Sequence, residues 1–156
     1  VNTAGWTHFD SPPGEAIPAQ QRVRANFGNE IALLGYDLPR NRIRAGDELR
    51  LVLYWQALGA VKKNYQSFVH VAHPLDRVWV QEDHLNPGGL PTRRWPTDRY
   101  VWDEYKIRIP PDTPPGDYSI NIGVYLRSEG YRLQRCGESG DALGDSLVIA
   151  SVTVVK

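Results

Sequence analysis

Aromatic and basic residues gather around one long irregular stretch of the sequence, HLNPGGLPTRRWPTDR at 84–99. The residues that combine in and beside this stretch are Trp79, Arg93, Arg94, Trp95, Arg99, Tyr100 and Trp102. Sugar rings stack their C–H faces on Trp and Tyr, while Asp, Arg and Asn side chains take the hydroxyl groups. These residue types therefore predict a candidate saccharide-binding surface over residues 84–104.

The aromatic rings also have an alternative role in a hydrophobic core. Trp55 lies in the clearest alternating segment of the chain, and we expect it to be core. Trp79 and Trp102 lie in alternating segments too, where a Trp often packs against an opposing sheet. Trp95 is the ring we expect to be exposed, with filling of one end of the domain as the alternative.

The acidic residues of the same region do not predict an active site. A glycosidase needs two carboxylates that face each other across a cleft. Asp103 and Glu104 are neighbours in an extended segment and point to opposite faces, while a pairing of Asp83 with Asp103 is geometrically possible but has no support in the sequence. No G-x-S-x-G motif or phosphate-binding glycine loop before a helix occurs. We expect no catalytic residues, no enzyme activity and no cofactor.

Metal-binding patterns are sparse. His70 and His73 are three residues apart, which on a strand places them on opposite faces, so we expect His70 to be a hydrogen-bonded interior or interface residue. Cys136 is the one cysteine, which excludes an internal disulfide and a cysteine-based zinc cluster. Asp141 and Asp145 flank the loop GDALGD and are the candidates for calcium, with an ordinary polar loop as the alternative.

Alternating strand patterns account for most of the chain and would position these side chains. The clearest alternation places Leu49, Leu51, Leu53 and Trp55 on one face and predicts a central strand. Further strands are predicted at 23–27, 31–38, 68–72, 78–81, 101–109, 118–126, 131–133 and 146–155, with 68–72 and 78–81 as a hairpin. Short strands separated by turns predict an all-β, antiparallel β-sandwich, Ig-like or jelly-roll, of about eight to ten strands.

Length and charge limit the functional classes. A chain of 156 residues suits one domain, and we assign 21–156 to the sandwich and 1–20 to a Pro-rich lead-in or linker. Lys and Arg (18) balance Asp and Glu (18), so no basic field for nucleic acid is expected. No apolar stretch approaches the roughly 20 residues that span a bilayer, so we expect no membrane insertion by this segment. The absence of Met, even at position 1, suggests a fragment or a processed product.

Five phrases of the sequence carry a resemblance when they are taken together. They are ANFGNEIALLGYDL (25–38), RAGDELRLVLYWQAL (44–58), FVHV (68–71), PTRRWPTDRYVWDEYKIRIPPDTPPGDYSINIGVYL (91–126) and GDSLVIASVTV (144–154). As a set, over residues 23–155, the chain resembles the β-sandwich domain found after the membrane region of bacterial, Chloroflexi-like glycosyltransferases of the dolichyl-phosphate-mannose mannosyltransferase type. The resemblance implies an extracytoplasmic domain on the outer face of the membrane, attached to an enzyme whose catalysis occurs elsewhere. It implies no binding residues.

Two functions from different classes follow as hypotheses. The first is a non-catalytic extracytoplasmic accessory or interaction domain of a membrane-anchored glycosyltransferase-like protein, whose partners are a glycan or other parts of the parent protein. The second is an autonomous carbohydrate-binding module that uses residues 84–104. A cluster of exposed aromatic rings on one surface favours the second, and a large apolar patch favours docking to a partner.

Overall fold

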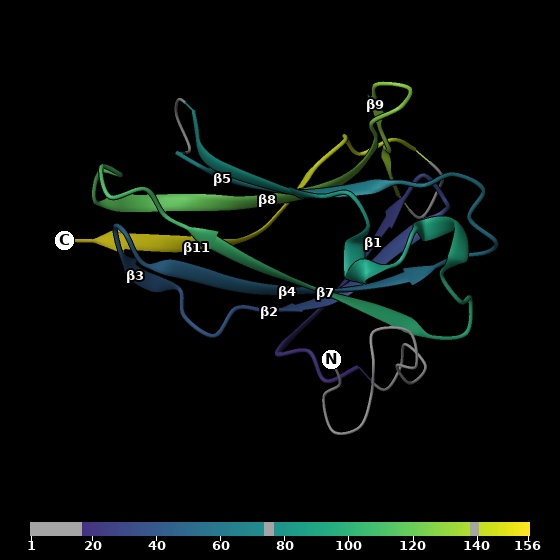
Figure 1. Ribbon diagram of the computed structural model, residues 1–156, viewed down its shortest axis with the longest axis horizontal. Helices are drawn as coiled ribbons and strands as arrows, with labels where there is room; N and C mark the ends of the chain where they lie inside the picture. Colours follow the sequence, from purple (N-terminus) through teal and green to yellow (C-terminus); the bar gives the residue numbers. More distant parts are fainter. Residues whose placement is uncertain (1–16, 74–76, 138–140) are drawn as a thin grey trace.

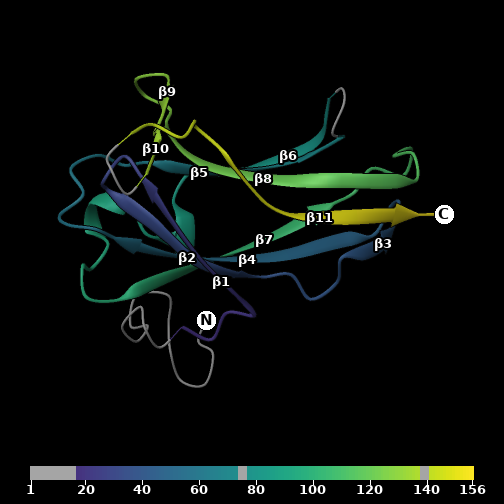
Figure 2. The same ribbon diagram turned by 180° about the vertical axis from the view of Figure 1, so that it is seen from behind.

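Two β-sheets packed face to face form the molecule in the computed structural model, which describes residues 17–73, 77–137 and 141–156 (Figures 1 and 2). The described chain contains eleven strands and two short 3-10 turns. They are β1 (Gln21–Phe27), β2 (Ile31–Asp37), β3 (Arg42–Arg44), β4 (Glu48–Ala57), β5 (Gln66–Ala72), β6 (Val78–His84), η2 (Pro87–Gly89), η3 (Thr92–Arg94), β7 (Tyr100–Arg108), β8 (Gly116–Leu126), β9 (Tyr131–Arg132), β10 (Arg135–Cys136) and β11 (Leu147–Val155). The predicted all-β sandwich is confirmed.

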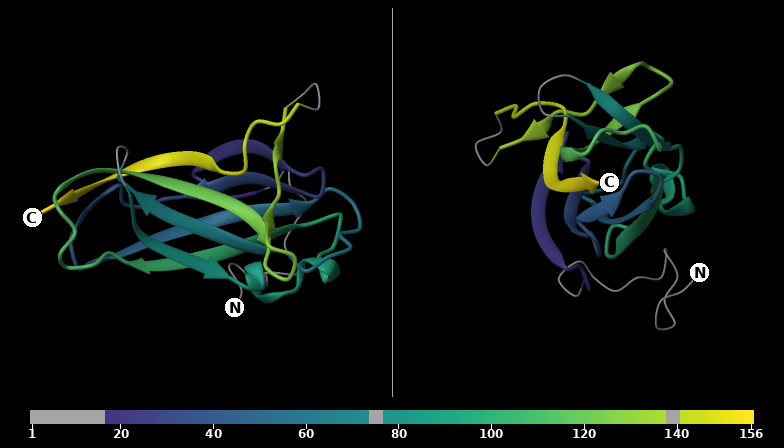
Figure 3. Two further views of the ribbon diagram at one scale, coloured as in Figure 1. Left: turned by 90° about the horizontal axis from the view of Figure 1, so that it is seen from above. Right: turned by 90° about the vertical axis from the view of Figure 1, so that its left-hand side faces the viewer.

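The strand order assigns each element to one of the two layers. The first sheet has the order β10-β1-β2-β4-β7, and the second has the order β3-β11-β8-β5-β6 with β9 paired to β8. Neighbours are antiparallel except β3, which runs parallel to β11. The predicted hairpin is present as the β5–β6 pair, although its turn at 74–76 lies outside the described residues. The C-terminal end of β11 and strand β9 lie toward opposite ends of the long axis (Figures 1 and 3).

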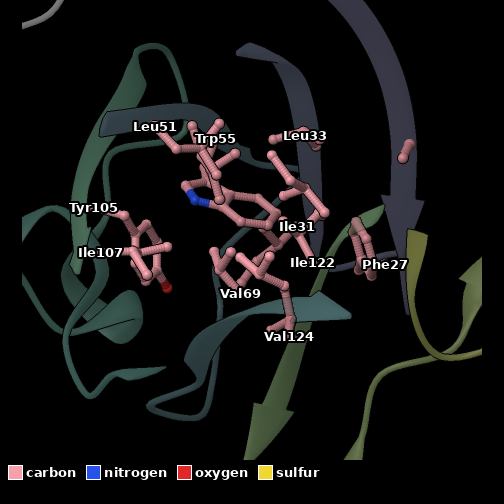
Figure 4. Close-up of a cluster of buried hydrophobic side chains, with 14 of the residues drawn as sticks. Phe27, Ile31, Leu33, Leu51, Trp55, Val69, Tyr105, Ile107, Ile122 and Val124 are labelled. Atoms are coloured by element: carbon pink, nitrogen blue, oxygen red, sulfur yellow. The ribbon is translucent and has the colours of Figure 1, made fainter. Parts of the chain in front are cut away.

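The core fills the space between the sheets and depends on the alternation in β4. The inward face of β4, predicted from the sequence, is at most 1% exposed at Leu49, Leu51, Leu53 and Trp55. Trp55 is met edge-on by Phe27, with ring centroids 5.9 Å apart, and Val69 approaches it from the second sheet (Figure 4). Burial of this apolar surface is the main driving force for closing the two sheets on each other.

The outer face of the first sheet is covered by the segment that precedes β1. Ile17 is only 7% exposed and packs in a second apolar cluster with Tyr54, which is 6% exposed. The backbone N–H of Gln20 donates to the Asp37 carboxylate at 2.6 Å. The last residues of the predicted linker 1–20 therefore pack on the sandwich, and the rest of that segment lies outside the described residues.

Two short strands were not expected from the sequence. Strand β3 forms because Arg42 and its neighbours align with Thr153 in β11, and β10 forms because Cys136 aligns with Asn26 in β1. Segments of two or three residues carry no readable alternation, so a partner strand rather than a local pattern determines them.

The loop between β6 and β7 is irregular, as predicted, and contains η2 and η3. Gly88 in η2 has φ +72°, and its N–H donates to the Asp103 carboxylate at 3.0 Å. A Cβ at this position would clash with the Val101 side chain. The loop therefore lies directly against β7 at a point where only glycine fits.

We expect Gly88→Ala to lower the free energy of unfolding by about 2–5 kcal/mol, because the left-handed backbone and the clash with Val101 both add cost. The matched control is Gly89→Ala, since Gly89 has φ +83° but open space around it; we expect a loss of about 1–2 kcal/mol there. Urea unfolding followed by Trp fluorescence measures both values. Equal losses in the two variants would show that the loop does not press on β7.

Candidate functional site

Two of the predicted saccharide-binding rings are buried in the protein. Trp95 is 5% exposed within the main core, and its indole N–H donates to the Leu90 carbonyl at 2.8 Å. Tyr100 is 4% exposed and meets Tyr54 edge-on at 5.6 Å. The expectation of an exposed Trp95 is wrong, because its hydrogen bond within the loop turns the ring inward. The alternative, in which Trp95 fills one end of the domain, agrees better with its place in the main core cluster.

The other two rings are half-buried on different surfaces. Trp79 packs against the main core, and the Arg77 guanidinium lies 3.8 Å from its ring centroid. Trp102 packs against the cluster on the outer face of the first sheet. Arg99, also in the predicted set, lies 3.8 Å from the Asp98 carboxylate. The four rings therefore do not share one exposed surface.

Arg93 and Arg94, the remaining members of the predicted set, are exposed in η3. With Asn64 they line a depression of about 320 Å³. Thr92, only 1% exposed, fixes η3 by accepting from the Tyr65 N–H at 2.9 Å and donating to a backbone carbonyl at 2.6 Å. The two arginines therefore project from an anchored turn.

The calcium candidates lie in a polar loop. Asp145 pairs with Arg132 at 3.3 Å, and Asp141 is exposed. Across residues 17–73, 77–137 and 141–156, no group of three or more His, Cys, Asp or Glu side chains is placed to hold a metal ion. Asp145 therefore acts as the ion-pair partner of Arg132.

A buried carboxylate connects the two sheets near the β6–β7 loop. Asp103 is 3% exposed and accepts hydrogen bonds from Ser67 Oγ at 3.2 Å, from the Gly88 N–H at 3.0 Å and from His84 Nδ1 at 2.7 Å. Ser67 also bonds the Tyr105 hydroxyl, and the His84 ring stacks flat on Tyr105 with centroids 3.7 Å apart. The carboxylate is thus satisfied by three donors from three separate segments.

This cluster contains the residue types of a nucleophilic triad but not its geometry. A serine nucleophile must pass its proton to a histidine. Here Ser67 is 1% exposed and bonds the carboxylate and Tyr105, while His84 bonds the same carboxylate. The hydrogen bonds of this cluster hold β5, β6, β7 and the β6–β7 loop together.

A groove crosses the outer face of the second sheet, the face turned away from the core. Its volume is about 380 Å³, and we call it the outer-face groove. It is lined by Phe68, His70, Gln81, Asp83, Tyr125, Arg127, Gly130, Tyr131 and Arg132. Cross-strand partners share a face, and the register pairs Phe68 with Asp83 and His70 with Gln81. The β-sheet pairing therefore gathers these residues from β5, β6, β8 and β9.

The floor of the outer-face groove is a layered aromatic unit. The Phe68 ring lies over Gly123, where a Cβ would clash with it, and the Arg132 guanidinium covers the ring at 4.4 Å. Tyr125 lies beside Phe68, with centroids 6.2 Å apart. Arg132 is held in turn by Asp145. The Phe68 ring is therefore held by Gly123 on one face, by Arg132 on the other and by Tyr125 at its side.

Polar groups along the outer-face groove are oriented by their neighbours. Asp83 accepts from the Tyr125 hydroxyl at 2.6 Å and from the Gln81 amide at 3.3 Å. Burial, together with the hydrogen bond to Asp83, raises the pKa of Tyr125 to about 12, so it remains a donor. Burial and then the Arg132 charge lower the pKa of His70, against the effect of Asp83. His70 is therefore neutral at pH 7 and offers one donor and one acceptor.

Sequence reasoning missed this groove. We expected His70 to be a hydrogen-bonded interior or interface residue, and the structure places it half-buried on the outer face of the second sheet, where it lines the groove. The sequence pattern could not give the strand register, which brings Asp83 of β6 and the β8–β9 hairpin to the same face as Phe68.

Comparisons with known proteins add little about function. No family model matches the sequence, and no curated protein matches it. A Niemann-Pick type C2 protein from Japanese carpenter ant is similar in structure, with a TM-score of 0.44 and 8% sequence identity over 90% of this chain and 99% of that chain. A likeness of this degree carries no argument about activity. Among the described residues, no helix has the length and apolar character to cross a membrane.

His84 makes the stability of the protein depend on pH. Burial opposes protonation of His84, but the hydrogen bond and charge of Asp103, with Glu82 and Asp83, outweigh it and raise the pKa of His84 above 6.5. A histidine whose pKa is higher in the folded state than in the unfolded state stabilises the fold fully at pH values below its unfolded-state pKa. This stabilisation is lost as the pH rises through its folded-state pKa.

We therefore expect His84→Gln to lose more unfolding free energy at about pH 5.5 than at about pH 8.5. His70→Gln is the matched control, since the lowered pKa of His70 gives the opposite sign: its contribution is lost as the pH falls. Denaturant midpoints at the two pH values measure both. An equal loss for His84→Gln at each pH would contradict the charged pair.

Proposed function

We propose that the chain is a non-catalytic accessory domain that binds a saccharide through the outer-face groove. The observation that carries the proposal is the lining of the groove, which combines the exposed Tyr131 ring and the half-buried Tyr125 ring with an acid, an amide, a neutral imidazole and guanidinium groups. Saccharide sites need this combination, because the ring C–H faces pack on aromatic surfaces while each hydroxyl both donates and accepts.

The polar side chains are suited to neighbouring hydroxyl groups. Asp83 has two of its acceptor positions used by Tyr125 and Gln81, and a carboxylate has about four such positions. His70 supplies one donor and one acceptor in its neutral form. Tyr131, 39% exposed at the rim, provides the accessible ring. Because these groups are already oriented, a ligand would cost little ordering of side chains.

Binding rather than hydrolysis fits the charges in the groove. Hydrolysis of a glycosidic bond calls for two carboxylates on either side of the bond. Among the described residues that line the outer-face groove, Asp83 is the single carboxylate. We therefore assign the groove to recognition.

The proposed setting rests on the sequence resemblance. In an extracytoplasmic domain of a membrane-anchored glycosyltransferase-like protein, a saccharide-binding groove would hold a glycan near the enzyme. The placement on the outer face of the membrane belongs to the proposal.

We expect Tyr131→Ala to weaken saccharide binding about tenfold or more, because it removes the accessible stacking ring. A glycan array of the purified domain identifies the ligand, and titration calorimetry then compares the variants. Leu58→Ala is the control, since Leu58 has the same 39% exposure as Tyr131 but lies outside the groove. An array without signal from folded protein would sink the proposal.

A further inference from the structure

Two further depressions share lining residues with the outer-face groove or with each other, near the ends of β5, β6 and β8. Arg127 lines both the outer-face groove and a second depression of about 610 Å³. Asn64 lines that second depression and also the third, which holds Arg93 and Arg94. Figures 1 and 3 agree in placing the η turns at the same end of the molecule as β9. We call these three depressions, which are linked by the shared residues Arg127 and Asn64, the extended groove.

One buried side chain builds the middle of the extended groove. Gln66 is 8% exposed and its amide N–H groups donate to the carbonyls of Asn64 at 2.7 Å and Leu85 at 3.3 Å. Its amide oxygen accepts from the Arg127 N–H at 2.7 Å. Three separate segments of the wall are thereby held at fixed positions. The middle depression is a built feature of the fold rather than a chance gap between loops.

The charges along the extended groove are strongly one-sided. Its charged lining residues are Arg93, Arg94, Arg127, Arg132 and Asp83. Arg132 is paired with Asp145. In the described part of the chain, the other three arginines have no ion-pair partner. The whole chain has no net charge, so this excess of positive charge is local to the groove.

We propose that the extended groove binds a linear acidic polysaccharide, with its sugar rings running from Tyr131 toward η3 and its carboxylates at Arg127 and at the Arg93–Arg94 pair. The inference rests on the proposed function and names its ligand class. Guanidinium groups bind carboxylates through two parallel hydrogen bonds, and a uronic acid offers one carboxylate per sugar. The groove is elongated and carries arginines at separated positions, which suits a polysaccharide that carries a carboxylate on each sugar.

A single-stranded nucleic acid is the competing anionic polymer, and the groove is less suited to it. Such ligands stack successive bases on exposed aromatic rings. Phe68 is 2% exposed and lies between Gly123 and Arg132. Among the described residues that line the extended groove, Tyr131 is therefore the one aromatic ring that is well exposed to solvent. One ring does not form a base-stacking platform.

The first experiment compares two probes of equal length by titration calorimetry. One is a galacturonic acid hexamer, and the other is the same hexamer with its carboxyl groups reduced to neutral galactose. We expect the acidic hexamer to bind about tenfold more tightly at low salt, and the difference to shrink as salt is raised.

The second experiment locates the carboxylates with charge-matched variants. We expect Arg93→Ala with Arg94→Ala to weaken binding of the acidic hexamer about fivefold. Binding of a galacturonic acid dimer should not change, because the proposal places a dimer in the outer-face groove, away from Arg93 and Arg94. The control is Arg24→Ala with Arg108→Ala, which removes the same charge from exposed positions outside the groove.

The outcomes separate the two proposals. Equal binding of both hexamers, lost in Tyr131→Ala and unaffected at Arg93 and Arg94, overturns the acidic polysaccharide and leaves the saccharide groove intact. No binding of either hexamer, together with a blank glycan array, overturns both. Tighter binding of oligothymidylate than of the acidic hexamer, lost in the Arg93–Arg94 variant, overturns the polysaccharide assignment in favour of nucleic acid.

Discussion

The need to satisfy one buried carboxylate fixes much of the geometry around the binding surface. Asp103 lies between the sheets at 3% exposure, and an unpaired charge there would cost several kcal/mol. Its donors come from β5, from the end of β6 and from Gly88 in the loop that follows. The carboxylate on β7 therefore holds both the edge of the second sheet and the start of the β6–β7 loop in place.

The β6–β7 loop, held in this way, forms part of the wall of the extended groove. It begins at Leu85, which Gln66 binds, and it continues to η3, which Thr92 anchors. The η3 turn, which carries Arg93 and Arg94, thereby lies at the same end of the molecule as strand β9 (Figure 1). The interior is filled by apolar side chains around Trp55 (Figure 4), so we place recognition on the outer surface of the second sheet. Sites carried on a rigid sheet and on anchored turns need little reorganisation on binding.

The sequence predicted the elements better than the surface. Alternation in β4 identified its buried face and its interior position, because side-chain period and burial are local properties. The same rule failed for Trp95, whose burial depends on a hydrogen bond to Leu90 within an irregular loop. The groove could not be predicted from the sequence, because strand order and register decide which side chains of β5, β6 and β8 lie next to one another. His70 alone suggests little; beside Asp83 and Tyr125 it becomes part of a binding surface.

The most direct test of the account is to map the ligand on the protein by NMR. Amide shifts of the labelled domain would be followed during titration with the saccharide that the array identifies. The account predicts shifts concentrated on outward-facing residues of β5, β6 and β8 and on the β9 hairpin, with little change on the first sheet. Shifts concentrated on the outer face of the first sheet, around Trp102, would contradict it.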